Sequence, residues 1–191
     1  TAENIANVRK KFIEQLSSRA AGYYESLLGS SEITEVEGIK LSYRSDLCEN
    51  DLVLNSTRFA QNLLANHGKD IARGATTLGI HRDDFEISLK TAFASYALAK
   101  QVASQGQCRT IAISLVLGAV DVLTDWLGEF PVILLDDVES ELDEERLRGL
   151  YGLLRRLESQ VIVTSTEISR SLVEQMTGVE VLKIEGGKVQ K

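Results

Sequence analysis

A short apolar run followed by two acids constrains the fold of this 191-residue chain more than any other stretch. Residues 132–135 read Val-Ile-Leu-Leu, which is typical of a strand buried on both faces of a parallel sheet. Asp136 and Asp137 follow at once. Ligands of open α/β sheets bind beyond the carboxyl ends of the strands, so we expect these two acids at a binding crevice.

Two adjacent carboxylates at such an edge need partners, because burying an unpaired charge is costly. A magnesium ion that carries a nucleotide is one such partner, since Mg²⁺ commonly takes one or two protein carboxylates together with phosphate oxygens. The alternative is a strand that ends in a solvated Asp-Asp turn. This stretch alone leaves both interpretations open.

The second half of the chain alternates short apolar runs with segments of helical spacing, which predicts an α/β fold. The expected strands are 85–89, 132–135, 161–163 and 179–184. Over 107–125 apolar residues surround a helix on nearly all sides, which predicts a buried helix. Residues 91–103 fit either a strand or a helix.

A further helix is expected after the two acids. Ser140 suits its N-cap, and Asp143, Glu144 and Glu145 suit its first turn, where carboxylates interact favourably with the helix dipole. Its predicted buried stripe is Leu147, Leu150, Tyr151, Leu154 and Leu157.

The first part of the chain has a different organisation. Apolar residues at three- and four-residue steps over 5–27 predict one long helix. Residues 39–43 alternate as in a half-buried strand, and 51–67 predict a second helix that Gly68 would end. We therefore expect a mostly helical segment over 1–76 and a separate module over 77–191.

Composition limits the possible functions. The net charge of −7 makes the chain a poor DNA binder by itself, because such binding depends on neutralising phosphates. Cys48 and Cys108 are far apart and read as reduced thiols. We find neither a secretory signal nor an apolar run of about 18 residues, so we expect a cytoplasmic protein without a membrane span.

A glycine-containing turn opens the expected buried helix, with the sequence Ser-Gln-Gly-Gln-Cys-Arg over 104–109. The amino end of a helix offers unpaired N–H groups and a positive dipole end, which suit a phosphate. Ser104 would add a hydroxyl, and Gly106 would allow a phosphate to approach the backbone.

Three segments in this order resemble the RecF family, within the ABC-type ATPases of the SMC-like group. They are Gly79–Asp84, Ala103–Thr110 and Leu134–Asp143. The resemblance covers 77–191 as the carboxyl-terminal lobe of an ABC-type P-loop NTPase fold. Residues 1–76 resemble, more loosely, the helical arm that precedes this lobe.

The resemblance implies a role for each matching residue. Ser104, Gln105, Gly106 and Gln107 match the signature loop, which contacts the γ-phosphate held by the opposite subunit. Asp136 matches the Walker B aspartate that supports Mg²⁺, and Asp137 occupies the position of the catalytic base. The shorter arm of aspartate, where other ABC proteins have glutamate, is consistent with slow hydrolysis.

Two further segments match the family pattern. Ser140 and Asp143 delimit the D-loop, which crosses the dimer interface. Residues 163–166 match the switch strand, in which Ser165 is nearest to the position of an absent histidine.

No P-loop is present in the sequence. The motif G-x-x-x-x-G-K-[ST] places a lysine on the β- and γ-phosphates, whereas the two Gly-Lys pairs here, Gly68-Lys69 and Gly187-Lys188, do not fit it. We therefore expect a carboxyl-terminal piece that needs an amino-terminal lobe to bind ATP and Mg²⁺, and that is inactive alone.

The resemblance implies half of an ATP-gated DNA clamp. The full protein would form an ATP-dependent homodimer, bind gapped or junction DNA, and act with mediator proteins in recombinational repair, replication restart and the SOS response. One alternative is a metal-dependent nuclease or phosphoesterase that combines His81, Asp83 and Asp84 with Asp136 and Asp137. The other is an inactive module that dimerises through its first helix.

Overall fold

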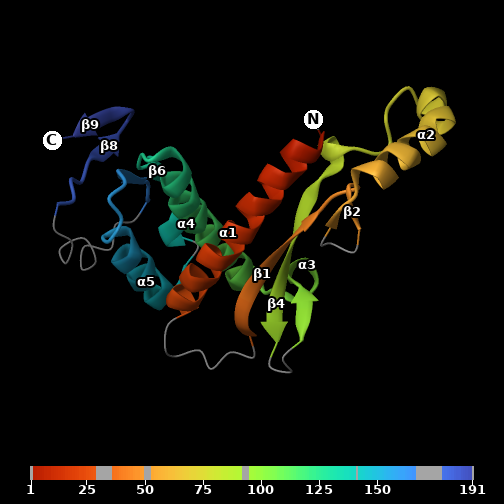
Figure 1. Cartoon of the computed structure of the whole chain (residues 1–191). Coiled ribbons are helices and arrows are strands. Elements are labelled where there is room, and N and C mark those ends of the chain that lie inside the picture. Colours follow the sequence, from red (N-terminus) through yellow and green to blue (C-terminus); the bar gives the residue numbers. More distant parts are fainter. Residues whose placement is uncertain are drawn as a thin grey trace. The chain divides into compact units, whose positions relative to one another are not determined.

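The computed structural model describes residues 2–28, 36–49, 53–91, 95–140, 142–166 and 178–190 (Figure 1). The chain forms two compact units, Thr1–Pro131 and Val132–Lys191. This division differs from the module boundary that we expected at residue 76, because strands from both sides of that boundary pair with each other within the first unit.

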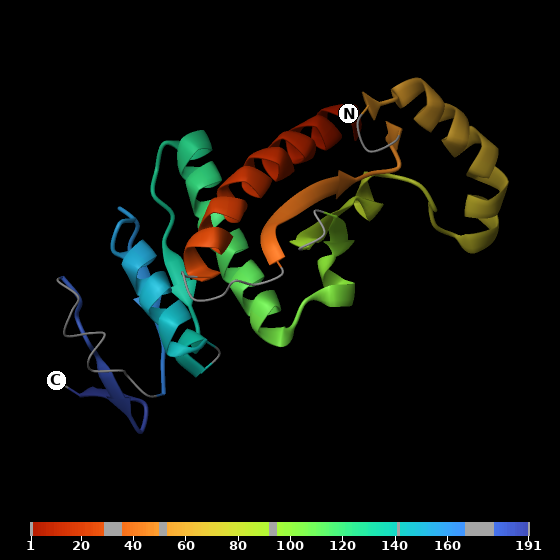
Figure 2. The ribbon, with the colours of Figure 1, turned by 90° about the horizontal axis from the view of Figure 1, so that it is seen from below.

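The first unit combines two long helices with an antiparallel sheet. The helices are α1 (Ala2–Leu28) and α4 (Gln105–Leu127). The sheet has the order β1-β4-β5, made of β1 (Val36–Arg44), β4 (Asp84–Thr91) and β5 (Tyr96–Leu98), and α3 (Ala99–Val102) follows it. Figure 2 shows α1 and the strand β1 side by side, with the amino end of α4 near them. The ambiguous segment 91–103 thus contains both a strand and a short helix.

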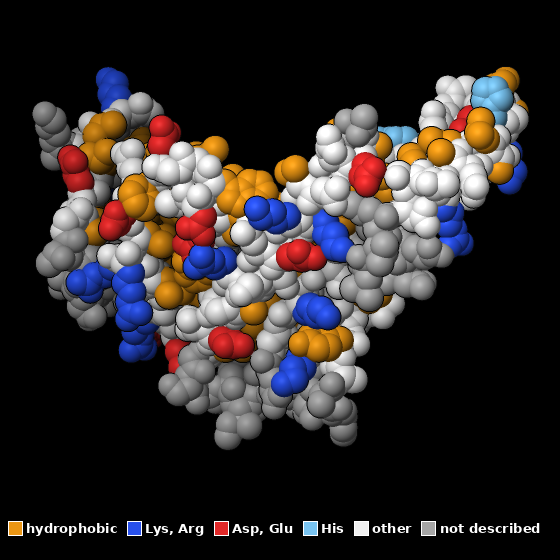
Figure 3. Space-filling view, in the orientation of Figure 1, with side chains coloured by type: hydrophobic (Ala, Val, Ile, Leu, Met, Phe, Trp, Pro, Cys, Tyr) orange, Lys and Arg blue, Asp and Glu red, His pale blue; other side chains and the backbone are white. Residues whose placement is uncertain are grey.

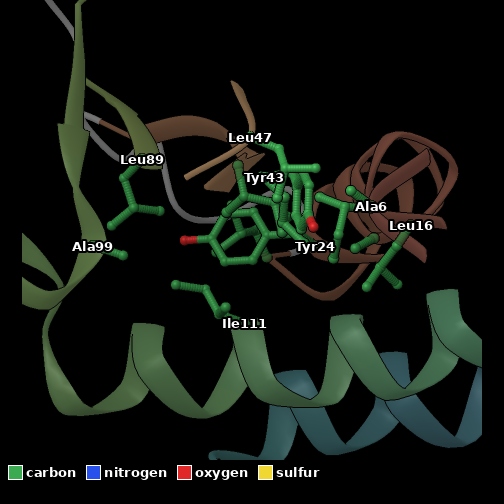
Figure 4. Packing of buried hydrophobic residues seen from close by; sticks show 13 residues of the cluster. Ala6, Leu16, Tyr24, Tyr43, Leu47, Leu89, Ala99 and Ile111 are labelled. Atoms are coloured by element: carbon green, nitrogen blue, oxygen red, sulfur yellow. The ribbon is translucent and has the colours of Figure 1, made fainter. Parts of the chain in front are cut away.

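One hydrophobic core joins the helices to the sheet. Ile39, Leu41 and Tyr43 alternate along β1 and are buried, as the sequence predicted. They lie opposite Leu89, Ile87 and Phe85 of β4, so these pairs point to the same face of the sheet. Figure 4 shows this face meeting Tyr24 and Leu16 of α1 and Ile111 of α4.

The helices α1 and α4 lie in close contact at Gly118. A Cβ atom on Gly118 would lie 2.9 Å from the backbone nitrogen of Ala20 and 3.2 Å from its Cα. Only a residue without a side chain fits there without displacing backbone atoms.

The first unit also contains α2 (Ser56–Arg73), the short strands β2 (Cys48–Glu49) and β3 (Val53–Leu54), and the 3₁₀ turn η1 (Ile80–Arg82). Our prediction that Gly68 ends this helix is wrong. An interior glycine costs a helix only about 1 kcal/mol. The helix instead ends at Gly74, whose φ of 68° is left-handed and whose N–H donates to the carbonyls of Asp70 and Ile71.

Helix α4 is long and apolar enough, by length and composition, to cross a membrane. Several of its residues are buried, including the polar Thr110 and Ser114, whose hydroxyls bond to carbonyls one turn earlier. The prediction of burial on nearly all sides was too broad. An exposed stripe runs along Gln105, Cys108, Ala112 and Val116. Most of these side chains are polar or small, so they gain little from burial.

The second unit is built on a parallel two-stranded sheet. Strands β6 (Ile133–Leu135) and β7 (Val161–Val163) pair in parallel, and η2 (Val138–Ser140) and α5 (Glu144–Leu154) lie between them in the chain. A hairpin of β8 (Lys183–Glu185) and β9 (Lys188–Gln190) turns at Gly186-Gly187. Of the strand expected over 179–184, only Lys183 and Ile184 lie in a strand, at the start of β8.

Burial of β6 differs from the sequence prediction. Ile133 exposes 2% of its surface, but Leu134 exposes 69%. Leu134 lies opposite Ile162 of β7, which is also exposed, so one face of this parallel pair is uncovered. Parallel sheets are normally covered on both faces, which makes this apolar face unusual.

The cap of α5 also differs. Asp143, not Ser140, is the N-cap, and its carboxylate accepts a hydrogen bond of 2.9 Å from the backbone nitrogen of Arg146. Ser140 instead ends η2. The predicted stripe is buried from Leu147 to Leu154, while Leu157 lies beyond the helix and is half-buried.

A polar cluster ties α1 to the sheet of the first unit. The Asp83 side chain, only 1% exposed, accepts hydrogen bonds from Arg9 at 3.1 Å and from the hydroxyl of Tyr43. Arg9 also donates to the carbonyl of Ile80 at 2.5 Å. Arg9 itself lies on an exposed face of α1, yet it forms an ion pair with a buried acid.

This cluster predicts an alkaline loss of stability. Burial, reinforced by the hydrogen bond to Asp83, raises the pKa of Tyr43 from 10.0 to about 12. Because the folded state favours the neutral phenol, this stabilisation is present below pH ~10 and is lost as the pH rises from about 10 to about 12. Urea unfolding should therefore show a falling midpoint over this interval. Tyr43→Phe should reduce the fall, and an identical pH profile for this variant would contradict the assignment.

Candidate functional site

The residues singled out from the sequence fall into two groups, one in each unit. Ser104, Gln105, Gly106 and Gln107 lie at the amino end of α4, in the first unit. Asp136, Asp137, Ser140 and Asp143 follow β6, in the second unit.

The amino end of α4 is held by a capping box. The Ser104 hydroxyl accepts from the backbone nitrogen of Gln107 at 3.2 Å, and the Gln107 side chain accepts from the backbone nitrogen of Ser104 at 2.8 Å. Ser104 and Gln105 are exposed. The turn is thus rigid and accessible, and its dipole end suits an anion.

Asp136 follows the last residue of β6 and is exposed. The hydroxyl of Thr164, just after β7, donates to its carboxylate Oδ1. Because the carboxyl ends of parallel strands meet at one edge, residues after β6 and β7 come together there. Thr164 therefore orients the carboxylate of Asp136, which we predicted to support Mg²⁺.

Asp137 has an unusual backbone conformation. Its φ of 48° lies in the left-handed region, and among the described residues it is the only one other than glycine with a positive φ. Its N–H donates to Thr164, both to the carbonyl and to the hydroxyl, each at 3.1 Å. Aspartate tolerates this region better than most residues, and such strain commonly occurs at functional sites.

The expected D-loop residues lie beyond this edge. Ser140 is the last residue of η2, and nothing is described of its side chain. Asp143 caps α5, and its second carboxylate oxygen pairs with the Arg146 side chain at 2.9 Å. In this structure Asp143 therefore stabilises the start of a helix.

Sequence reasoning missed a hydrogen-bond network centred on Glu139. Its carboxylate accepts from the Tyr151 hydroxyl and, at 2.7 Å, from the Ser165 hydroxyl. Burial, with a further contribution from Glu139, raises the pKa of Tyr151. The signal lay in the strand pattern, because Thr164 and Ser165 follow a second parallel strand and so share the edge of the two acids.

The donors at this edge fit a magnesium ion. Asp136 is an exposed carboxylate at the end of a parallel strand, with a hydroxyl to orient it. The nuclease alternative finds less support. In the part of the chain that the structure describes, no three His, Cys, Asp or Glu residues are grouped to hold a metal, and Asp83 is bound by Arg9 and Tyr43.

Comparison with known proteins identifies the family. A model described as "AAA domain, putative AbiEii toxin, Type IV TA system" matches residues 54–165, more than half of the chain. The chain belongs to this AAA-domain family. Both strands of the acidic edge and the turn before α4 lie within the matched residues of this AAA-domain chain.

Curated relatives of this AAA-domain chain include proteins named RecF. The DNA replication and repair protein RecF of Citrifermentans bemidjiense is 31% identical over 183 residues, which are 95% of this chain and 48% of its own length. RecF of Clostridium perfringens is 31% identical over 188 residues, 98% of this chain and 48% of its own length. The chain thus spans about half the length of these relatives, and the resemblance to RecF is confirmed.

Solved structures support the same fold. A structure of the recombination mediator protein RecF with ATP, from the RecFOR pathway, has a TM-score of 0.71 and 26% identity, and it covers 99% of this chain and 46% of its own. A structure from work on ATP-driven dimerization of SMC ATPases has a TM-score of 0.55 and 14% identity, covering 97% of this chain and 86% of its own. The fold of RecF and SMC-type ATPase domains is therefore confirmed.

Proposed function

We propose that this chain is the carboxyl-terminal part of a RecF-like ATPase that binds DNA in recombinational repair and replication restart. It would supply the signature loop, the Walker B acids and the D-loop to a composite ATP site, while the remaining half of the protein supplies the P-loop. The single observation that carries this proposal is the edge of β6, where Thr164 holds Asp136 and Asp137 occupies a left-handed conformation.

Each residue has a distinct task in this site. Asp136 would hold Mg²⁺ through its water shell, and the ion would neutralise charge on the transferred phosphate. Asp137 would polarise the attacking water as a general base. The rigid turn of Ser104, Gln105, Gly106 and Gln107 would contact the γ-phosphate of an ATP bound by the partner, and Ser140 and Asp143 would cross the interface of the dimer.

The wider role in DNA repair is supported by similarity to the relatives over nearly the whole length of this chain. The relatives are named for DNA replication and repair, one solved neighbour is a RecF structure with ATP, and another comes from work on ATP-driven dimerization. We infer an ATP-dependent homodimer that binds gapped or junction DNA with other mediator proteins, in the cytoplasm. The uncovered face of β6 and β7 fits a chain that is completed by a further lobe.

The test joins the chain to the amino-terminal half of a RecF relative and measures its mass in solution with and without ATP. The joined protein should dimerise only with ATP and Mg²⁺. Ser104→Arg should abolish dimerisation, because the arginine would fill the place of the phosphate at the turn. Ser56→Arg is the matched control, since Ser56 is an exposed first-turn residue of α2.

Circular dichroism should show that both arginine variants remain folded. If ATP causes no dimerisation of the joined protein, or if Ser104→Arg dimerises as well as Ser56→Arg, the composite site is refuted.

A further inference from the structure

The residue that follows β7 is bonded on several sides to the chain that follows β6. The backbone nitrogen of Thr164 donates to the carbonyl of Leu135 at 2.9 Å, and the carbonyl of Thr164 accepts from the backbone nitrogen of Asp137 at 3.1 Å. Its hydroxyl donates to the carboxylate of Asp136. Thr164 is exposed, so the placement of both acids depends on a residue at the open end of a three-residue strand.

The next residue, Ser165, is anchored by Glu139. The Ser165 hydroxyl donates to Oε2 of the Glu139 carboxylate at 2.7 Å, and the Tyr151 hydroxyl donates to Oε1. Tyr151 belongs to α5 and exposes only 8% of its surface, so it gives the carboxylate a fixed partner. Hydrogen bonds to an ionised acceptor are about twice as strong as bonds between neutral groups. Glu139 therefore links the end of β7 to the buried side of a helix.

The backbone of Asp137 explains how Glu139 reaches this place. Asp137 has a left-handed φ of 48°, whereas the strand before it is extended. A single left-handed residue turns the direction of the chain sharply. Residues 135–139 thus bend round the end of β7, and Glu139 meets Ser165 there.

Glu139 acts inside its unit and not as part of a charged surface. Its side chain is half-buried, and each carboxylate oxygen accepts from a hydroxyl of the same unit. Figure 3 shows side chains of both charge signs over the second unit, whereas a surface for a charged partner needs mainly one sign. The two hydroxyl contacts therefore define what this carboxylate does.

We propose that Glu139 is a positioning residue for Asp136 and Asp137. Through Ser165 it fixes the backbone of Thr164, which in turn bonds to the carboxylate of the first acid and to the backbone of the second. Residues that orient the groups of a site in this way set its precision. The inference rests on the proposed function only in taking the two acids as the magnesium support and the base, because the anchoring itself needs no nucleotide.

The first test is amide hydrogen exchange of the 191-residue chain, measured by NMR without nucleotide. The amides of Asp137 and Thr164 report on the carboxyl end of the strand pair. The amide of Ile133, which donates to the carbonyl of Gln160 at 2.9 Å, reports on the other end. Glu139→Ala should raise exchange of the carboxyl-end amides relative to that of Ile133 by at least about tenfold, because only this end loses its anchor.

Further variants separate the hydrogen bond from charge and from stability. Ser165→Ala removes one bond of the anchor and keeps the Glu139 carboxylate, so it should also raise the exchange ratio, whereas Ser165→Thr keeps a hydroxyl and should preserve the ratio. Leu154→Ala is the stability control, because Leu154 is buried in α5. It should accelerate exchange at both ends of the strand pair alike. An unchanged ratio in Glu139→Ala, or an equal rise in Leu154→Ala, would overturn the anchor.

The second test measures ATP turnover by the protein joined to the amino-terminal half of a RecF relative. Glu139→Ala should lower kcat by about 10–100-fold and raise the Mg²⁺ concentration that gives half-maximal turnover, as expected when a residue that orients a metal-supporting group is lost. The KM for ATP should change by less than about twofold, because the phosphate contacts are intact. Glu158→Ala removes an exposed carboxylate from the same unit and should leave all three values unchanged.

The two proposals fail separately. If the joined protein neither dimerises with ATP nor hydrolyses it, the composite ATP site is refuted, while the exchange ratio still decides whether Glu139 holds the two acids. If the joined protein hydrolyses ATP and Glu139→Ala hydrolyses it equally fast, the positioning role is refuted and the composite site stands.

Discussion

Replacing Asp137 with asparagine should lower ATP turnover by the complete dimer by about 10²–10⁴-fold, the usual contribution of a general base. ATP binding and dimerisation should remain, because Asp136 and the proposed signature loop, Ser104 to Gln107, are unchanged. Asparagine suits this position structurally, since it also tolerates the left-handed backbone that Asp137 adopts at a φ of 48°. The measurement is phosphate release in single and multiple turnovers.

Two further variants separate catalysis from backbone strain. Asp137→Gly removes the carboxylate and relieves the left-handed conformation, whereas Asp137→Ala removes the carboxylate and keeps a Cβ. We expect both variants to lose turnover. In urea unfolding, the free energy of unfolding of Asp137→Ala should be lower than that of Asp137→Gly by about 1 kcal/mol. Unchanged turnover in the asparagine variant would exclude Asp137 as the base.

Replacing Gly118 with alanine should destabilise the first unit by about 1–3 kcal/mol, the usual cost of overpacking. The new methyl group would lie 2.9 Å from a backbone nitrogen of α1 and 3.2 Å from the neighbouring Cα. Backbone atoms yield less easily than side chains, so the two helices must separate and lose packing along their contact. Urea unfolding followed by circular dichroism measures the change.

Gly22→Ala is the control for helix propensity. Gly22 lies within α1, where an added Cβ would meet no atom within 4 Å. Alanine there should stabilise the chain by about 0.5–1 kcal/mol, because it lowers the entropy of the unfolded chain and favours the helix. If both alanine variants are stabilised, the close contact between α1 and α4 at Gly118 is refuted.

Local patterns predicted most of the elements because each pattern has its own physical cause. The alternation of Ile39, Leu41 and Tyr43 gave β1, and the apolar spacing of 5–27 gave the long α1. The turn over 104–109 was found because a glycine-containing turn leads into an apolar helix, and the structure adds that Ser104 caps this helix and that Gln107 completes the capping box.

Contacts between distant residues were beyond the same reasoning. Nothing in the sequence pairs Arg9 with Asp83, or Glu139 with Tyr151, because these contacts depend on how separate elements fold back. Helix ends were also uncertain. Gly68 and Ser140 were suitable residue types, but Gly74 and Asp143 formed the caps, since hydrogen bonds and not residue type decide the boundary.

The uncovered side of β6 and β7 has a consequence for the history of such a protein in the cell. During synthesis, these strands leave the ribosome before anything covers them. Leu134, Ile162 and Val132 then form an exposed apolar surface beside open strand edges. Chaperones recognise surfaces of this kind, and other unfinished chains can join them by strand pairing. Rapid covering of these three side chains would therefore matter as much to the yield of intact protein as the strength of any ligand site.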